Sequence, residues 1–467
     1  MRRAWKAGMV MIGLLTPAAA AAQVEPAARA VVERAVEAMG GEAALRGVER
    51  VRLDMMTQWQ RTRYDGRPAG DRPSFEPHTD VRDYTIPAWR NTREFGPRRI
   101  VNVVRDSVAI TDLGNGFQTQ SVAYVDERDE LFVYTPDRLM LKALDAPSLT
   151  LGADTTLAGE RYRQVRARLD GRLAVTIAFH AGTGLPAVLR FRQGHPNDFG
   201  LVPFGAMEVE VAYAGWQSSG GIHIPTQWDI ARAGSPYKRM TVQRVVFNPD
   251  FPADSFAVSD SLRHAFVATR APMHDRPVDS VTVATDGLVQ VHGFGFPAGA
   301  LRVGEAWLLL EAGHAPLSLE RGREALARSG VPAPTGALVV GARPGNGGVV
   351  SLVREGIPVW TSRAAAPFLD VMLANEGVPA RNVTVVAEGT WVELGGARVR
   401  LEPVDLPDVH GSLLLWSPTL RWLWAPDAIT PLDLSFVRAA AAAHGWDVRA
   451  VGTPRGLWVE EEGGEGR

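Results

Sequence analysis

The chain has 467 residues, of which 46% are hydrophobic, and its 50 basic and 52 acidic residues leave a formal net charge of −2. This length predicts about two to three domains with their own cores. A charge so close to balance gives no basic patch that would indicate nucleic-acid binding. The chain contains no cysteine, which excludes disulfides, thiolate metal ligands and a lipid-carrying cysteine.

Residues 1–22 have the features of a secretory signal peptide. Three basic residues lie among the first six, residues 7–15 are apolar, and three alanines precede Gln23. An anchoring helix is the alternative, but the apolar run is well short of the roughly 20 residues that a bilayer requires. We expect cleavage and export to the periplasm or the cell exterior, with no transmembrane segment in the mature chain.

Residues 23–258 are predicted to begin with a helix and to continue as one antiparallel sheet. Apolar side chains recur on one helical face of residues 25–39, and Gly40-Gly41 ends that helix. Hairpin signals such as Asp170-Gly171 separate the strand-like runs that follow. The predicted strands are 51–59, 99–104, 107–110, 117–124, 131–134, 162–169, 173–179, 187–193, 207–216, 222–231 and 238–248.

This helix and sheet resemble the periplasmic lipoprotein-carrier proteins, in which a curved half-barrel and a helix enclose an apolar groove. The resemblance covers residues 26–258 and implies an apolar cavity, as is usual for small-molecule sites. Residues 61–97 are polar and rich in Pro and Arg, so we expect either a lid over the groove or a disordered surface loop. His180, His195 and His223 are interpreted as turn or surface histidines rather than ligands.

A second domain is predicted over residues 286–456, after a linker at 259–285 that carries charge and proline without a period. Its strands, alternating strand–helix units and final strands and helix favour a four-layer αβ/βα sandwich, so the fold class of the chain is α+β. The tail, 457–467, is acidic and rich in glycine, which predicts disorder. The helices are expected at 317–329, 347–355, 364–375 and 432–444.

The second domain is organised around residues 403–428, which predict a strand followed by the hairpin 412–416 and 421–424. His410 precedes one strand of this hairpin and Asp427 follows the other, at strand ends where loops often carry chemistry. This spacing resembles the metallo-β-lactamase-fold hydrolases, in which a His before the hairpin and an Asp after it hold metal. The resemblance implies that His410 and Asp427 are remnant metal positions.

The same resemblance implies a motif of His-x-His-x-Asp-His before a Gly-Gly pair, at the end of a strand. Here the pair is Gly347-Gly348 and the strand is 336–340, but no ligand position holds a residue that can donate an electron pair to zinc. These four positions are Val340, Ala342, Pro344 and Gly345. A further His of the family falls near Thr453. The scaffold is therefore expected without its main metal motif.

Other residues could rebuild a metal site with His410 and Asp427. They are His292, His314, Asp405 and Asp408. Two retained groups predict weak binding, because structural zinc takes four protein ligands and catalytic zinc three. Asp427 and His410 are also ordinary turn and loop residues. A Ser–His–Asp site has less support, since no Gly-x-Ser-x-Gly elbow follows a strand.

Together these features predict an exported bacterial cell-envelope protein with a catalytically degenerate metallo-β-lactamase-like domain. We expect it to bind an apolar small molecule or lipid, or an envelope protein partner, without a cofactor. No catalytic residue is assigned. The alternative is a metal-dependent hydrolase with a non-standard or single-metal site that holds zinc, since fold alone does not decide function.

Overall fold

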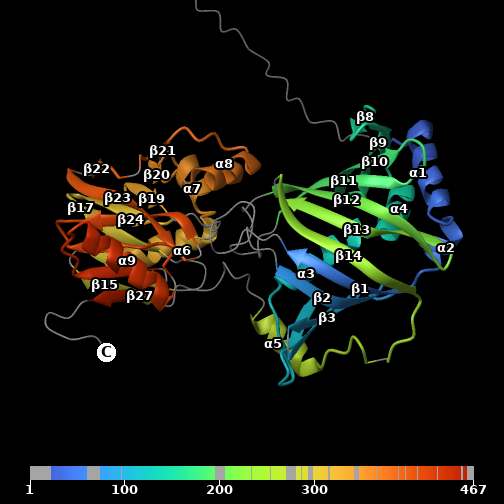
Figure 1. Ribbon diagram of the computed structural model, residues 1–467, viewed down its shortest axis with the longest axis horizontal. Coiled ribbons are helices and arrows are strands. Elements are labelled where there is room, and N and C mark those ends of the chain that lie inside the picture. Colours follow the sequence, from blue (N-terminus) through green and yellow to red (C-terminus); the bar gives the residue numbers. More distant parts are fainter. Residues whose placement is uncertain are drawn as a thin grey trace, which may run out of the picture.

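The structure of the protein is a computed structural model. Figure 1 shows two groups of elements, a large sheet with its helices and a sandwich of two smaller sheets. The described residues are 23–59, 74–95, 97–194, 206–232, 234–252, 254–269, 280–285, 287–292, 298–313, 316–340, 346–363, 365–387, 389–394, 396–407, 409–428, 430–453 and 456–459.

The N-terminal part is built on one 14-stranded antiparallel sheet that does not close into a barrel. Its strands are β1 (Arg50–Trp59), β2 (Ser74–Asp83), β3 (Ala88–Phe95), β4 (Arg98–Arg105), β5 (Val108–Asp112), β6 (Phe117–Thr119), β7 (Leu149–Leu151), β8 (Thr155–Leu157), β9 (Glu160–Leu169), β10 (Leu173–His180), β11 (Pro186–Gly194), β12 (Ala206–Ser219), β13 (Ile222–Arg232) and β14 (Ser235–Phe247). Their order is β6-β5-β4-β3-β2-β1-β14-β13-β12-β11-β10-β9-β7, with β8 paired to β9. The first and the last long strand therefore pair in the middle of the sheet.

Helices cover one face of this sheet and bury its apolar side chains. They are α1 (Pro26–Ala38), α2 (Glu42–Arg46), α3 (Ala123–Tyr134) and α4 (Pro136–Leu144). The apolar face predicted for α1 is buried through Val32 and Val36, which confirms that helix. After it, Gly40 has φ +120° and a Cβ there would lie 2.5 Å from the carbonyl oxygen of Gly221, so the position requires glycine.

The strands predicted at 117–124 and 131–134 are wrong beyond Thr119, because α3 spans most of these residues. The buried residues of α3 include Arg128 and Glu130 as well as Leu131. Charged residues on the inner face remove the apolar period of 3.6 by which a helix is recognised. The short apolar run at the end of α3 therefore has the pattern of a strand.

The lid or disordered loop expected at 61–97 is also wrong for the residues described there, because β2 and β3 are inner strands of the sheet. Residues 60–73 and 96 lie outside the described part. The inward positions of β2 carry Glu76, Asp80 and Arg82, all buried. These charged side chains hide the apolar alternation that marks a half-buried strand.

The linker predicted at 259–285 contains regular structure. Helix α5 (Asp260–Thr269) packs on β5 and β6 and buries Phe266, and β15 (Ser280–Thr285) already belongs to the next sheet. Residues 270–279 are outside the described part. A single buried aromatic in a charged helix gives too weak a pattern for detection from sequence.

The C-terminal part contains a seven-stranded sheet, ordered β15 to β21, and a six-stranded sheet, ordered β22 to β27. The strands that follow β15 are β16 (Leu288–His292), β17 (Ala298–Val303), β18 (Ala306–Leu310), β19 (Gly336–Val339), β20 (Val359–Thr361), β21 (Val383–Val385), β22 (Trp391–Leu394), β23 (Ala397–Leu406), β24 (Val409–Ser417), β25 (Trp422–Trp424), β26 (Ala450–Thr453) and β27 (Gly456–Val459). The helices are α6 (Pro316–Arg328), α7 (Val349–Arg354), α8 (Ala366–Asn375) and α9 (Pro431–Ala443).

Three apolar cores separate the layers of this part. One joins α6, α7 and α8 to the seven-stranded sheet, a second lies between the sheets, and a third joins the six-stranded sheet to α9. Adjacent residues of β24 serve different cores, since Leu413 faces the other sheet and Leu414 faces α9. The predicted four-layer sandwich, the hairpin of β24 with β25 and the α+β class are confirmed. No helix of the described residues has the length and apolar character that crossing a membrane requires.

Candidate binding site

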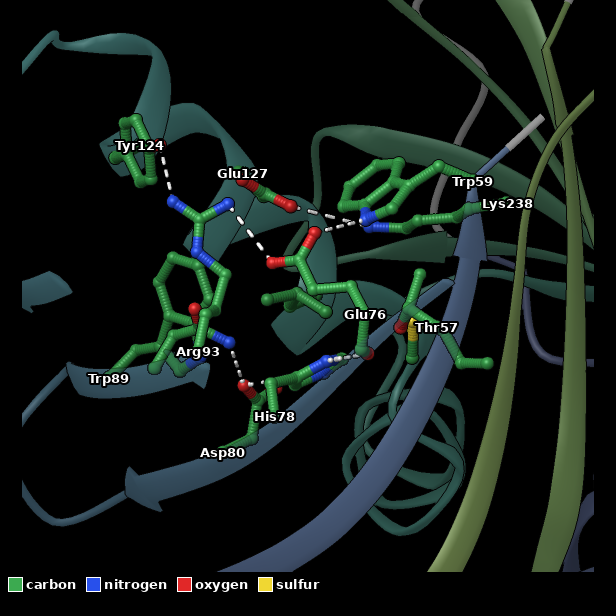
Figure 2. A pocket seen from close by; sticks show the side chains of 13 residues that line it. Thr57, Trp59, Glu76, His78, Asp80, Trp89, Arg93, Tyr124, Glu127 and Lys238 are labelled. Carbon is green, nitrogen blue, oxygen red and sulfur yellow. Dashed lines mark hydrogen bonds and ion pairs between the residues drawn. The ribbon is translucent and has the colours of Figure 1, made fainter. Parts of the chain in front are cut away.

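A small cavity of about 50 Å³ lies on the helix-covered side of the N-terminal sheet, between α3 and the strands β1, β2, β3 and β14. Figure 2 shows charged and aromatic side chains converging on it from these elements. Alternate residues of a strand point to one face, which places Glu76, His78 and Asp80 of β2 side by side. The lining residues are Thr57, Trp59, Glu76, His78, Asp80, Trp89, Asn91, Arg93, Tyr124, Glu127, Leu131, Lys238 and Met240.

The charged groups at this cavity are removed from water. Glu76, Asp80 and Lys238 are each less than 5% exposed, and Arg82 beside them is fully buried. Charged side chains are almost never buried to this extent unless they are paired. A buried ion pair is weak evidence for stability, since an apolar replacement is often as stable. The cluster is therefore a candidate functional site.

Glu76 contacts both Trp59 of β1 and Arg93 of β3, on opposite sides of β2. Trp59 Nε1 donates to Glu76 Oε2 at 2.8 Å, and Arg93 Nη1 lies 3.2 Å from Glu76 Oε1. Arg93 also donates through Nη2 to the hydroxyl oxygen of Tyr124 at 3.2 Å. These contacts, drawn in Figure 2, hold β1, β2, β3 and α3 together around the cavity.

Asp80 lies at the floor of the same cluster and accepts bonds from two neighbours. Asn91 Nδ2 donates to its Oδ1 at 2.7 Å, Arg82 Nη2 donates to its Oδ2 at 3.0 Å, and His78 Nε2 lies 3.8 Å from Oδ1. Burial by itself would raise the pKa of Asp80, but the charges of His78 and Arg82 and these hydrogen bonds lower it below its ordinary value. Asp80 is therefore a carboxylate at neutral pH.

Lys238 of β14 completes the wall opposite β3. Its Nζ lies 3.4 Å from Glu127 Oε1 and 5.1 Å from the centre of the Trp59 ring. On the neighbouring strand β13, Arg232 donates to Glu130 at 2.8 Å, and both side chains are buried. An ammonium over an aromatic face is attracted by the ring quadrupole, more strongly when water is excluded. Lys238 is thus held by a carboxylate and a ring at once.

Four buried polar side chains on this face have no hydrogen-bond partner among the described residues. They are Thr57, Trp89, Asn102 and Thr111, through Thr57 Oγ1, Trp89 Nε1, both amide atoms of Asn102 and Thr111 Oγ1. Asn91, Asn102 and Thr111 are direct cross-strand partners on β3, β4 and β5, so they share the face of the cavity. Buried polar groups are normally satisfied by protein, water or ligand. The unpaired groups of Thr57 and Trp89 line the cavity itself.

The cavity differs from the apolar groove that the sequence predicted. Six of its lining side chains are ionisable acids or bases other than tyrosine, and its volume has room for roughly three to five water-sized groups. Tyr134, Tyr213 and Trp228 belong to the hydrophobic core of this part. The expectation of an apolar lining is wrong for this cavity.

The sequence contains one signal for this site. Glu76, His78, Asp80 and Arg82 occupy every second position of a ten-residue stretch, which is the period of a strand with one polar face. A polar alternation normally indicates a solvated face, so burial of that face could not be inferred from the stretch alone. The other walls of the cavity come from α3 and β14, which are distant from β2 in the sequence.

The remnant metal positions lie on the expected hairpin. His410 is in β24, with its side chain outside the described part, and Asp427 follows β25 at 1% exposure, where Ser412 Oγ donates to its Oδ2 at 2.7 Å. Asp405 is exposed in β23, and His292 Nε2 lies 3.1 Å from Thr282 Oγ1. His314 and Asp408 are not among the described residues. Within the part of the chain that is described, no three His, Asp or Glu side chains form a possible metal group.

The strand end that carries the metal motif in the resembled hydrolases is occupied by other contacts. Val340 is fully buried, and its backbone N–H donates to Glu311 Oε1 at 3.2 Å. Asn346 Nδ2 donates to Glu311 Oε2 at 3.0 Å, and the N–H of Ala312 donates to Asn346 Oδ1 at 3.0 Å. An apolar side chain and a carboxylate committed to two N–H donors are not a zinc donor set. These residues do not fit the metal.

The histidines and aromatics of the first sheet have structural surroundings. His180 Nδ1 accepts from the N–H of Thr183 at 3.0 Å and so stabilises the turn after β10. His223 lies in β13, and His195 is outside the described residues. Trp228 is fully buried in the core. The interpretation of His180 as a turn residue is confirmed.

No protein-family model matches the chain, and no curated protein matches it. Among solved structures, a LolA superfamily protein from Nitrosomonas europaea is 10% identical, with a TM-score of 0.32, over 50% of this chain and 97% of its own. A metallo-β-lactamase from Pontibacter korlensis is 13% identical, with a TM-score of 0.29, over 37% of this chain and 89% of its own. A metallo-β-lactamase from Pseudomonas aeruginosa in its mono-zinc form is 15% identical, with a TM-score of 0.30, over 38% of this chain and 87% of its own.

Proteins of both resembled families are thus among the structures similar to this chain, each over half of it or less. The sheet order and the three cores of the sandwich define the fold independently of these likenesses. No activity is transferred from proteins at such low identity, because function depends on the site and not on the scaffold.

Proposed function

We propose that the protein is an exported binding protein whose N-terminal part takes up a small molecule through a polar end group. The observation that carries this proposal is the pair of unpaired polar groups, Thr57 Oγ1 and Trp89 Nε1, that line a cavity already surrounded by ion pairs. A polar ligand atom would satisfy both groups. The C-terminal part then serves structure or recognition without metal catalysis.

The chemistry of the cavity narrows the ligand. Trp89 Nε1 can only donate, the Thr57 hydroxyl can donate or accept, and Arg93 and Lys238 add positive charge close by. The carboxylates Glu76 and Glu127 already balance these cations. A neutral or zwitterionic group with a hydrogen-bond acceptor therefore suits the site better than a free anion. The sequence predicted an apolar small molecule or lipid as the ligand. The cavity favours a ligand of that kind whose end group is neutral or zwitterionic and carries a hydrogen-bond acceptor.

Thermal unfolding with small probe molecules tests the proposal. The probes are glycerol for a neutral polyol, glycine for a zwitterion, and acetate and inorganic phosphate for anions. A ligand that binds the folded state raises Tm according to its concentration relative to Kd. We expect glycerol or glycine to raise the Tm of the wild type, and Thr57→Val to abolish that rise, because the substitution keeps the shape and removes the hydroxyl.

The matched control is Thr241→Val on the neighbouring strand. Thr57 pairs with Met240, which lines the cavity, so the next residue, Thr241, points to the opposite face. The control should keep the ligand-dependent rise. An equal rise in Thr57→Val and in the wild type, or no rise with any probe, would contradict the proposed site.

The alternative function is that of a hydrolase with a single metal held by Asp427 and His410. The retained Asp and the hairpin geometry favour it, but Asp427 is buried and accepts a hydrogen bond from Ser412. Without the imidazoles of the main motif, little remains to lower the pKa of a bound water toward neutrality. Metal analysis of the purified protein distinguishes the two functions, as described below.

A further inference from the structure

The outer face of strands β9, β10 and β11, labelled at one end of the large sheet in Figure 1, carries a concentration of arginine. In β9, Val165 and Ala167 are buried against the helices, so Arg166 and Arg168 between them point outward. In β11, Leu189 and Phe191 are buried, and the adjacent arginines likewise point outward. The helices and the polar cavity lie on the opposite face of the sheet.

Strand register brings these arginines together. Arg166 pairs with Thr176 of β10, and Thr176 pairs with Arg190 of β11, so the three side chains form one row across the face. Arg192 lies two residues further along β11, and Arg172 lies in the turn between β9 and β10. The face is hollowed into an open depression of about 670 Å³. Five arginines line it: Arg166, Arg168, Arg172, Arg190 and Arg192.

Acidic side chains neutralise only part of this charge. Glu208 lines the depression, and Glu210 Oε2 accepts from Arg190 Nε at 2.6 Å. Five arginines less these two glutamates leave a local charge of +3, on a chain whose formal net charge is −2. The charge is therefore concentrated on one face instead of being spread over the surface.

Two of the five guanidinium groups are available for a partner. Arg192 donates to the carbonyl oxygens of Ala206 and Asn375, at 2.5 and 3.1 Å. In contrast, the side chains of Arg166 and Arg172 are exposed and have no hydrogen bond or ion pair within the described residues. A guanidinium group presents a planar fork of donors that matches phosphate oxygens.

We propose that this arginine face docks the protein on a membrane surface rich in anionic phospholipid. Charge complementarity carries the proposal, since an open cationic sheet face attracts a layer of phosphate groups without a shaped pocket for any one of them. Single-stranded nucleic acid would call for exposed aromatic side chains as stacking platforms, and none line the depression. The one aromatic there, Phe191, is buried.

Vesicle co-sedimentation with the full mature chain tests this docking. We expect the wild type to sediment with vesicles of phosphatidylglycerol and phosphatidylcholine, but not with phosphatidylcholine alone, and to be released as salt is raised. A basic residue near an anionic leaflet strengthens binding by about fivefold. The double variant Arg166→Gln with Arg172→Gln should therefore bind more than tenfold more weakly. Both residues are exposed and unpaired, so the Tm should be unchanged.

The control variant, Arg328→Gln with Arg449→Gln, removes the same charge from exposed positions of the C-terminal part. It should bind as the wild type does. Equal loss in both variants would show attraction by net charge only and would overturn the proposal, as would unchanged binding in the Arg166/Arg172 variant. Sedimentation with neutral vesicles, or binding to single-stranded DNA or polyglutamate without binding to phosphatidylglycerol, would overturn it as well. None of these results depends on the polar cavity.

Discussion

Asp80 and Arg82, two residues apart on the inner face of β2, form an ion pair of 3.0 Å with both side chains at 2% exposure or less. Asp80 lines the polar cavity, and Arg82 also donates to Thr135 Oγ1 at 2.6 Å, which connects β2 to the end of α3. Each charge depends on the other, because an unpaired charge in such a place is very costly. This dependence gives the first prediction.

Replacing Asp80 by Asn should destabilise the protein by about 3 to 5 kcal/mol, because it leaves Arg82 buried without a counter-charge. The free energy of unfolding in urea measures the loss. Asp170→Asn is the surface control, since Asp170 pairs with Lys142 at 2.7 Å but is 65% exposed, and it should change stability by less than about 1 kcal/mol.

The double variant Asp80→Leu with Arg82→Met addresses the role of the pair. Apolar residues of similar volume often replace a buried ion pair without loss. We expect it to recover most of the stability that Asp80→Asn loses. A double variant less stable than the single one would show that the pair is needed for folding, contrary to the functional role inferred for the cluster.

Stability should fall in acid partly through Asp80. Burial would raise the folded-state pKa of Asp80, but the charges of His78 and Arg82, together with the hydrogen bonds from Asn91 and Arg82, bring it below its ordinary value. A depressed folded pKa adds stability above the unfolded value of about 3.9, and this stability is lost as pH falls through the folded pKa. Urea unfolding from pH 6 downward should show a smaller acid-dependent decrease in Asp80→Asn than in the wild type.

Ser412→Ala should cost about 1 to 3 kcal/mol, because it removes a hydrogen-bond donor from the buried carboxylate of Asp427. Ser435→Ala serves as the control, since Ser435 is exposed on α9 and donates only to the carbonyl oxygen of Leu432. Its effect should be within about 0.5 kcal/mol. Thermal unfolding of both variants makes the comparison. Equal Tm values would show that Asp427 does not need the serine.

Purified protein should contain much less than one zinc ion per chain. The motif positions Val340, Ala342, Pro344 and Gly345 provide no donor, and Glu311 is committed to Val340 and Asn346. Metal analysis after exposure to zinc and dialysis measures the content, and a chelator should leave the Tm unchanged. Tightly bound zinc that is lost in Asp427→Ala would support the hydrolase instead.

The mature chain should begin at or near Gln23 and be found outside the cytoplasm, because residues 1–22 have the charge, apolar run and small residues of a signal peptide. N-terminal sequencing of protein from the native cell fraction tests this. A native protein that begins at Met1 would contradict the export on which the cell-envelope function depends.

The sequence predicted the C-terminal sandwich well, because the strands of its sheets are apolar on one or both faces. Leu413 and Leu414 are neighbours in β24, and both are fully buried in different cores. A continuous apolar run of strand length predicts a buried strand even when its partner strand is not known. The boundaries proposed for the two domains follow from the same patterns and stay predictions.

The candidate site could not be predicted, because several of its buried charges meet their partners only in the tertiary fold. Glu130 of α3 pairs with Arg232 of β13, 102 residues away. Seen alone, each of these residues indicates a solvated surface. The same buried charged side chains removed the apolar patterns by which β2, β3 and α3 could be predicted. The elements and the site were therefore not predicted for the same physical reason.

The pairing of β1 with β14 in the middle of the large sheet affects how this part folds. Val51 is the partner of Phe247, a separation of 196 residues (247 minus 51). The strands from β1 to β6 and those from β9 to β14 can each form as meanders of sequence neighbours, but loop-closure entropy delays contacts between distant residues. A chain synthesised from its N-terminus therefore leaves one edge of β1 open to mispairing until residues 235–247 arrive. The last strand made in this part is the one that unites its sheet.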